Sequence, residues 1–144
     1  LGESIREAAT RVAGAAGIPI ECRIEAVDGG LSPASALRLF RVCQEGLNNI
    51  VKHAQASAVW VDLTQDSSHV RLTIRDNGRG FQPGAVTPTA VGDGFGLMGM
   101  TERARMMGGD LTIESAPGRG TTLTVVVPCS TTERHDAHSN PDRG

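Results

Sequence analysis

One stretch of the sequence, in which apolar and polar residues alternate before two glycines, limits the possible folds most. Val70, Leu72 and Ile74 alternate with polar residues, which is the pattern of a β-strand with one buried face. The pattern ends at the stretch Asp-Asn-Gly-Arg-Gly, residues 76–80. An Asn-Gly hairpin is its ordinary interpretation, but residues 81–94 carry two prolines and no strand periodicity. A carboxylate followed by two conformationally permissive glycines and a long loop therefore suggests a ligand pocket.

Composition sets broad limits on the class of protein. A chain of 144 residues is about one domain, and 3% aromatic residues predict an aliphatic core. The net charge of -2 gives no basic surface of the kind that nucleic-acid binding needs. Three cysteines without metal-ligand spacing point to a reducing compartment, and no apolar run or signal peptide indicates a membrane span. The chain begins with Leu1, so we expect a piece of a longer protein.

Apolar periodicity predicts three helices and about five strands. Ser4 and Glu7 are spaced as a capping box, and Ser32 precedes a proline at the first helical position. The expected helices cover residues 4–16, 33–54 and 97–107, and the expected strands cover residues 20–26, 57–65, 69–75, 111–114 and 121–127. We predict an α/β two-layer sandwich, with a mixed, mostly antiparallel sheet of about five strands covered on one face by three helices. The domain should span residues 1–128, followed by a disordered polar tail at 129–144.

Three further clusters accompany residues 76–80. Glu45 and Asn49 are four apart on the second helix and face the same way, with Lys52 nearby. For Glu45 and Lys52, the ordinary interpretation is a solvent-exposed helix face. An asparagine inside a helix, such as Asn49, is less usual, so a structural and a functional interpretation both stay open. Residues 94–100, Gly-Phe-Gly-Leu-Met-Gly-Met, precede a helix, whose free amides bind phosphate. The fourth cluster is Gly-Arg-Gly-Thr-Thr at 118–122, and neither a P-loop nor Rossmann spacing is present.

The four clusters, in this order, resemble the ATP-binding catalytic domain of sensor histidine kinases, in the superfamily that includes DNA gyrase, heat-shock chaperones and mismatch-repair ATPases. Residues 44–54, Gln-Glu-Gly-Leu-Asn-Asn-Ile-Val-Lys-His-Ala, resemble the asparagine box of that family. Residues 76–80 and 94–100 resemble its first and second glycine boxes, and residues 118–121 its last. The form of the asparagine box and a short lid are similar to the subfamily whose response regulators usually carry a helix-turn-helix output domain.

The resemblance implies a role for each side chain in the boxes. Asp76 would accept a hydrogen bond from the adenine amino group, which discriminates against guanine. Asn49 would give its amide oxygen to Mg²⁺, Lys52 would pair with phosphate charge, and His53 would line the nucleotide site. Glu45 would be catalytic, although a kinase that attacks with histidine does not need the water that this glutamate activates in ATPases.

The glycines are expected to act through the main chain, by allowing it to approach the nucleotide closely. Gly78 and Gly80 would let the main chain close over adenine, and Thr121 or Thr122 would add a hydroxyl near the base. The second glycine box would shape a lid and present amides to the phosphates. The residues that it adds to the expected ATP site are Gly94, Gly96, Leu97, Gly99 and Met100.

The implied function is donation of the γ-phosphate of Mg-ATP to a histidine that this chain lacks. His53 belongs to the asparagine box and His69 starts a strand, while His135 lies in a polar tail without the apolar heptads of a dimerising helix. The expected partners are the protein's own upstream dimerisation and phosphoacceptor helices and a response regulator, with no direct nucleic-acid contact. The full-length protein would be a homodimer, with this domain in the cytoplasm and a membrane anchor left open.

Two functions from other classes remain open. One is an anti-sigma-type serine kinase of the same superfamily, which the Lys-His-Ala form of residues 52–54 disfavours. The other is a non-catalytic, ATP-dependent binding module, for which the intact boxes give no support. The stability of the transferred phosphate separates histidine from serine, because phosphohistidine is labile to acid and stable to alkali.

Overall fold

Three α-helices, a π-helix and five strands make up the described part of the chain. The computed structural model describes residues 1–27, 29–80 and 97–129. The elements in order are α1 (Gly2–Ala16), β1 (Ile20–Ile24), α2 (Pro33–Asn49), η1 (Ile50–Ala54), β2 (Val59–Gln65), β3 (His69–Asp76), α3 (Leu97–Met106), β4 (Asp110–Ser115) and β5 (Thr121–Pro128).

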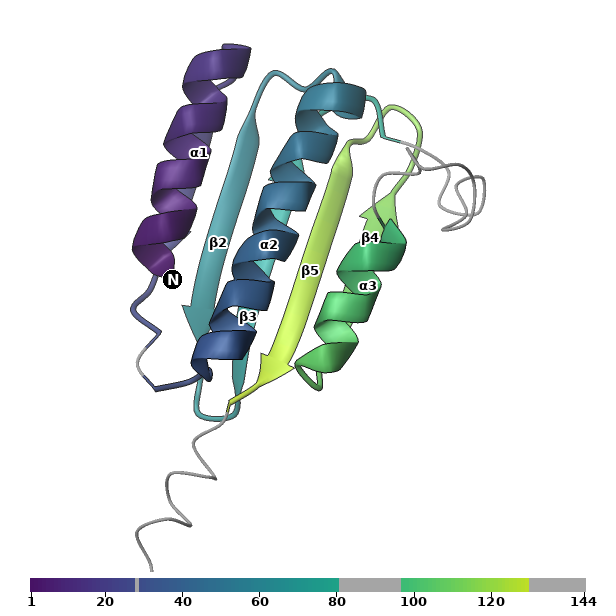
Figure 1. The fold of residues 1–144 in the computed structure, drawn as a ribbon. Helices are drawn as coiled ribbons and strands as arrows, with labels where there is room; N and C mark the ends of the chain where they lie inside the picture. Colours follow the sequence, from purple (N-terminus) through teal and green to yellow (C-terminus); the bar gives the residue numbers. More distant parts are fainter. Residues whose placement is uncertain (28, 81–96, 130–144) are drawn as a thin grey trace, which may run out of the picture.

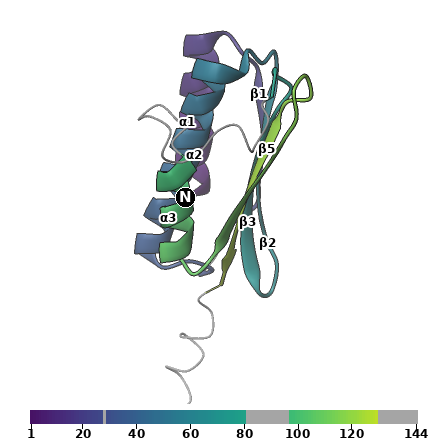
Figure 2. The same cartoon turned by 90° about the vertical axis from the view of Figure 1, so that its right-hand side faces the viewer.

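The strands form one mixed sheet in the order β1-β2-β3-β5-β4. Only β1 and β2 run parallel, and the other neighbours are antiparallel. The three α-helices lie side by side in a single layer against one face of this sheet (Figures 1 and 2). The predicted α/β two-layer sandwich is therefore confirmed.

Alternation along each strand explains why helices cover only one face. Val61, Ile74 and Leu123 lie side by side in the register of β2, β3 and β5, and all three are buried beneath the helices. Their sequence neighbours, such as Thr73 and Thr124, point to the other face, where the side chains are mostly polar and the described helices do not pack (Figure 2). The buried aliphatic side chains form one continuous core between sheet and helices. At its centre, α2 approaches the sheet closely, because a Cβ on Gly46 would lie 2.9 Å from Cδ1 of Ile74.

Local signals at the helix ends are confirmed in part. The Ser32 side chain accepts a hydrogen bond from the backbone N–H of Ser35 (3.1 Å) at the start of α2, and Gly17 ends α1 in the left-handed conformation. The predicted capping box at Ser4 is wrong, because α1 already begins at Gly2 with Leu1 as its N-cap. The second predicted helix changes to π geometry after Asn49 before it ends at Ala54.

Two predicted irregular segments cannot be compared with the structure. The loop at 81–94 and residues 130–144 of the tail lie outside the described residues. None of the helices in the described ranges combines the length and apolar character needed to cross a membrane.

Candidate nucleotide site

Asp76 is a buried carboxylate at the end of the central strand β3. Its side chain is only 5% exposed, and the backbone N–H of Gly78 donates a hydrogen bond to its Oδ1 atom (2.7 Å). Burial raises the pKa of Asp76, while backbone hydrogen bonds from Gly78 and Thr121 act in the opposite direction. A carboxylate kept at such a position can serve as a specific acceptor for a ligand N–H group.

Sheet register decides which hydroxyl groups accompany Asp76. Asp76 pairs with Thr121, and Thr121 pairs with Ser115, so all three lie on the helix-facing side of the sheet at one end. The Ser115 and Thr121 hydroxyl oxygens are 2.9 Å apart. Thr122 pairs with Arg75 and lies on the opposite face. Of the two threonines predicted near the base, the structure thus brings only Thr121 to the side of Asp76.

Two glycines allow the first and last glycine boxes to meet. Gly80 has φ 64°, and a Cβ there would collide with the carbonyl oxygen of Ala116. Gly120 has φ 78°, and a Cβ there would collide with the carbonyl oxygen of Asp76. The backbone N–H of Gly118 also donates to the carbonyl of Arg79 (2.6 Å). The two loops therefore pack backbone against backbone beside Asp76.

Asn77 connects this corner to the asparagine-box helix. Its Oδ1 atom accepts hydrogen bonds from the backbone N–H groups of Ser57 (2.9 Å) and Ala58 (3.0 Å), and its Nδ2 atom donates to the Ser57 hydroxyl (2.8 Å). Ser57 lies just beyond the end of η1, so these bonds hold the end of the helix at Asp76. Sequence analysis gave Asn77 no role, and the only available signal was its place between Asp76 and Gly78 in the first glycine box.

The asparagine box lies where α2 changes into the π-helix. Glu45 and Asn49 are half-buried on α2, and Lys52 is exposed on η1. A single π turn inside a helix is frequent at functional sites. The side chain of His53 lies outside the described part of the structure.

The second glycine box is described only from Leu97, the first residue of α3. Gly99 is exposed in the first turn of α3, whereas Met100 is fully buried in the core, on the side of α3 that faces the sheet. Gly94 and Gly96 lie outside the described residues, as does the side chain of Leu97. The nucleotide contacts predicted for this box therefore stay predictions.

The donor set at this corner suits a nucleotide better than a metal ion alone. Asp76, Thr121 and Ser115 offer a buried acceptor and two hydroxyls, as expected for a site that recognises a polar base edge. Among the described residues, no three His, Cys, Asp or Glu side chains gather to hold a metal ion. A hard cation such as Mg²⁺ would therefore need phosphate oxygens besides Asn49.

Comparison with known proteins identifies the family. The family described as "Histidine kinase-, DNA gyrase B-, and HSP90-like ATPase" matches residues 34–131, more than half of the chain. The chain belongs to this family of ATP-binding domains. The match covers the asparagine box, Asp76 and the later glycine boxes.

Curated relatives include two bacterial kinases. The signal transduction histidine-protein kinase/phosphatase UhpB of Salmonella typhimurium is 48% identical over 98 residues, which are 68% of this chain and 18% of UhpB. The sensor histidine kinase LiaS of Bacillus subtilis is 37% identical over 110 residues, 76% of this chain and 29% of LiaS. The chain thus spans less than a third of the length of either relative.

Solved structures share the fold. The histidine kinase domain of the Erythrobacter litoralis EL346 blue-light activated histidine kinase superposes with a TM-score of 0.77 at 21% identity, covering 95% of this chain and 64% of that one. The mycobacterial sensor histidine kinase MprB gives a TM-score of 0.66 at 25% identity, covering 88% of this chain and 93% of that one.

Proposed function

We propose that this chain binds Mg-ATP and donates the γ-phosphate to a histidine on a dimerisation segment outside it, as the catalytic domain of a two-component sensor histidine kinase. The observation that carries the proposal is the buried Asp76 carboxylate beside Thr121, within a chain of the ATPase family. The histidine kinase names of the relatives UhpB and LiaS support the same reaction class.

We propose a role for each side chain of the candidate site that the structure describes. Asp76 accepts a hydrogen bond from the adenine amino group, and Thr121 contributes a hydroxyl at the same edge of the base. Asn49 supplies an amide oxygen to Mg²⁺, which would neutralise phosphate charge during transfer. Lys52, exposed beside it, adds a cation for the phosphates. We keep Glu45 as a candidate catalytic residue, one turn of α2 before Asn49.

The proposed partners follow from the missing acceptor. The phosphoryl group would pass to a histidine of a homodimeric helical segment and then to a response regulator, which we expect to carry a helix-turn-helix output domain. The proposed domain acts in the cytoplasm and makes no direct contact with nucleic acid.

Calorimetry with ATP and GTP tests the base site. The chain should bind ATP and discriminate against GTP, and Asp76→Asn should weaken ATP binding by roughly 10- to 150-fold, the value of a hydrogen bond to a charged group. Asp110→Asn is a matched control, because Asp110 is exposed on the edge strand β4. Unchanged ATP affinity in Asp76→Asn, with the fold retained by circular dichroism, would reject the adenine assignment.

Transfer is tested by supplying the acceptor separately. The chain is mixed with labelled ATP, Mg²⁺ and a histidine-bearing dimerisation segment, and Asn49→Ala should abolish transfer while reducing nucleotide binding much less. The phosphate on the acceptor should be labile to acid and stable to alkali. The reverse stability would indicate a serine kinase, and ATP binding without transfer would indicate a non-catalytic module.

A further inference from the structure

A basic groove crosses the outer surface of the helix layer, on the side of α2 that faces away from the sheet. The polar residues that line this arginine groove are Arg11 of α1, Arg41, Gln44, Glu45 and Asn48 of α2, and Arg103 of α3. The four α2 residues follow the spacing i, i+3, i+4, i+7 and so form one stripe of the helix. The cavity volume is about 390 Å³, and flanking helices form both walls.

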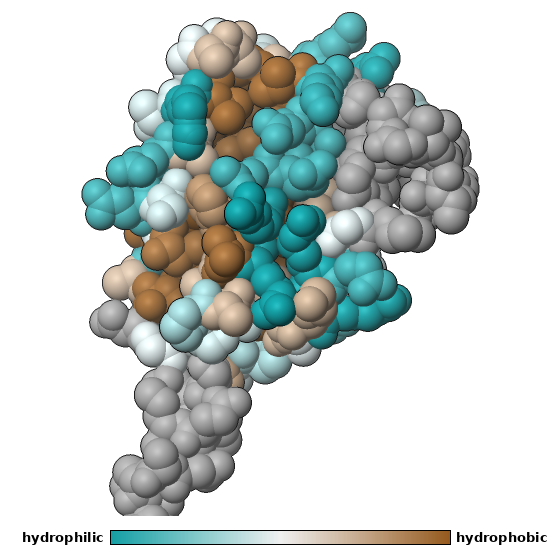
Figure 3. Space-filling model, in the orientation of Figure 1, coloured by the Kyte–Doolittle hydropathy of each residue, from teal (hydrophilic) through white to brown (hydrophobic). Residues whose placement is uncertain are grey.

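The groove gathers positive charge on a chain whose net charge is negative. Among the described residues that line the groove, three guanidinium groups accompany one carboxylate, that of Glu45, in a chain with a net charge of -2. None of the three arginines forms an ion pair within the described part of the chain. Figure 3 shows hydrophilic side chains gathered over the middle of this helix face. Because like charges repel, an anionic ligand in the groove would be stabilised.

One end of the groove adjoins the predicted phosphate end of the nucleotide site. Glu45 and Asn48 line the groove and also belong to the asparagine box, immediately before Asn49. On the other wall, Nη1 of Arg103 would lie 3.4 Å from a Cβ on Gly99, so its guanidinium reaches back over the first turn of α3. A segment lying in the groove would therefore end beside Asn49.

We propose that the arginine groove docks an acidic helix of the segment that carries the phosphoacceptor histidine. The identity of this occupant rests on the proposed function. The acceptor must approach from solvent, because the sheet side of α2 is filled by core contacts such as Gly46 against Ile74. Because α1 and α3 flank α2 on either side (Figure 1), a further helix can lie along α2 between them, and carboxylates on its buried face would pair with the guanidinium groups.

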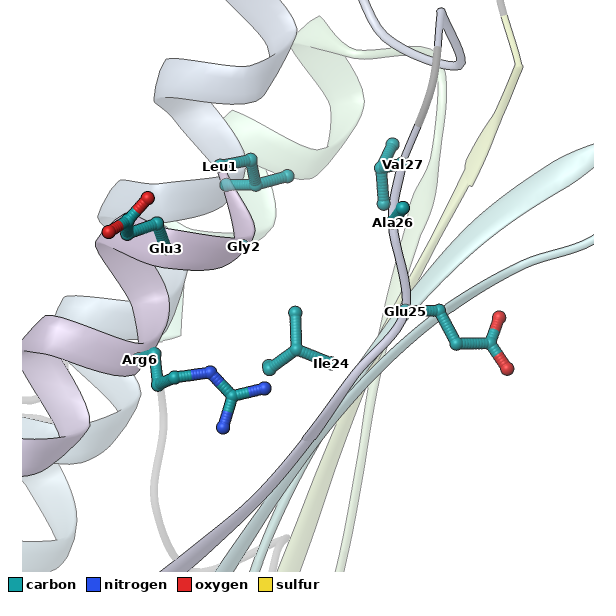
Figure 4. A pocket seen from close by; sticks show the side chains of 8 residues that line it. All are labelled: Leu1, Gly2, Glu3, Arg6, Ile24, Glu25, Ala26 and Val27. Carbon is teal, nitrogen blue, oxygen red and sulfur yellow. The ribbon is translucent and has the colours of Figure 1, made fainter.

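A second hollow shows none of these features. It lies between the first turn of α1 and the segment after β1, with a cavity volume of about 480 Å³. Glu3 and Glu25 accompany a single arginine there, Arg6, whose side chain reaches toward Ile24 (Figure 4). Its charges are of mixed sign, and none of the described residues that line it belongs to the predicted site.

Paired peptides test the charge preference of the groove. One peptide of about 20 residues, long enough to be helical, carries glutamates along one face and a single histidine, and its match carries glutamines at the same positions. In NMR titrations of the whole chain, the glutamate peptide should shift signals of α1, α2 and α3 and bind at least about tenfold more tightly than the glutamine peptide. Added salt should remove this difference.

Charge reversal locates the binding. Arg41→Glu should lower the affinity for the glutamate peptide by about fivefold. The triple reversal of Arg11, Arg41 and Arg103 should lower it by more than tenfold, and ATP affinity should be unchanged in both variants. Arg71→Glu is the matched control, because Arg71 is an exposed arginine on the open face of the sheet.

Three results would overturn the inference while leaving ATP binding by the wild-type chain intact. The first is equal binding of the glutamate peptide to wild-type and triple-reversed chains. The second is a loss of ATP affinity in the arginine variants, which would assign the groove to nucleotide phosphates. The third is a wild-type dimer that the triple reversal dissociates, which would assign it to a second copy. Failure of the wild-type chain to bind ATP would instead reject the proposed function.

Discussion

The environment of Asp76 makes one carboxyl group important for folding and, in the proposed site, for ligand binding. Burial raises its pKa above the ordinary value of 3.8, so the folded chain holds this proton more tightly than the unfolded chain. Stability from this group is fully present below the ordinary pKa and is lost as pH rises through the raised pKa. A ligand N–H group at the carboxylate would favour the ionised form and act in the opposite direction.

We therefore expect two opposite pH dependences. Relative to Asp76→Asn, the free energy of unfolding of the wild-type chain should decrease as pH rises from 3.8 through the raised pKa of Asp76. ATP affinity should decrease as pH falls through the same pKa. Urea titrations and calorimetry over this range measure both quantities. An ATP affinity independent of pH there would contradict a role for ionised Asp76.

Asn77 is expected to act through the backbone and not through the ligand. Asn77→Ala removes the hydrogen bonds to Ser57 and Ala58 and should cost about 1–3 kcal/mol of unfolding free energy, measured in urea. Asn77→Asp keeps an acceptor for the two backbone N–H groups, and its second oxygen can accept a hydrogen bond from the Ser57 hydroxyl in place of the one that Nδ2 donates. It should cost less than the alanine variant, and equal losses would show that the two acceptor bonds contribute nothing.

At the scale of elements, the close approach of two loops depends on glycine in two separable ways. Gly118 and Gly120 both have positive φ, 80° and 78°, but a Cβ on Gly118 meets nothing within 4 Å. At Gly120 the same atom would collide with the backbone of Asp76. Alanine at Gly118 therefore introduces backbone strain alone, whereas alanine at Gly120 introduces strain and also disrupts the packing of the two loops.

We expect Gly118→Ala to cost about 1–2 kcal/mol, the penalty of a left-handed residue. Gly120→Ala should cost about 3 kcal/mol or more and also weaken ATP binding, because Asp76 must move. Thermal unfolding and calorimetry of the two variants provide the comparison. If both alanines cost the same and leave ATP affinity unchanged, the contact between the loops has no energetic importance.

The elements show where sequence patterns are sufficient. Strand faces were predictable, because a period of two with aliphatic residues leaves only one buried face in a strand such as β3. The helix start at Gly2 was missed, because Ser4 and Glu7 satisfy a capping pattern without being at the end of the helix. The π geometry after Asn49 was also missed, since no pattern of residue types distinguishes it from a continuing α-helix. Which of Thr121 and Thr122 accompanies Asp76 required the strand register.

At the scale of the whole molecule, one cysteine reports on global unfolding. Cys43 is fully buried at the centre of α2, and burial raises the pKa of its thiol to about 12. The thiolate that reacts with alkylating reagents is therefore scarce and inaccessible in the folded chain. Cys22 and Cys129 are only half-buried.

In a chain with Cys22→Ser and Cys129→Ser, we expect Cys43 to react with iodoacetamide at least about a thousandfold more slowly than in urea. Saturating ATP should slow the reaction further by stabilising the folded state. Mass spectrometry follows the rate. Rapid alkylation under native conditions would show that α2 separates from the sheet without global unfolding.

The convergence of the boxes was predictable only through resemblance to a family. Residue types and spacing indicated a carboxylate with glycines and a helix with an asparagine, but not that they meet. The contacts of Asn77 with Ser57 and Ala58 and of Gly120 with Asp76 join segments far apart in the chain. Such tertiary pairings leave no periodicity in a single sequence.

The position of β5 in the sheet also governs how the chain can be made. In the described part of the chain, β5 lies between β3 and β4, and its pairing with β3 places Thr121 opposite Asp76. During synthesis, the edge of β3 that pairs with β5 must therefore stay without this partner until β5 leaves the ribosome. We expect nascent chains that end before Thr121 to expose that edge to proteases and chaperones, and the pocket corner to assemble in the last step of folding.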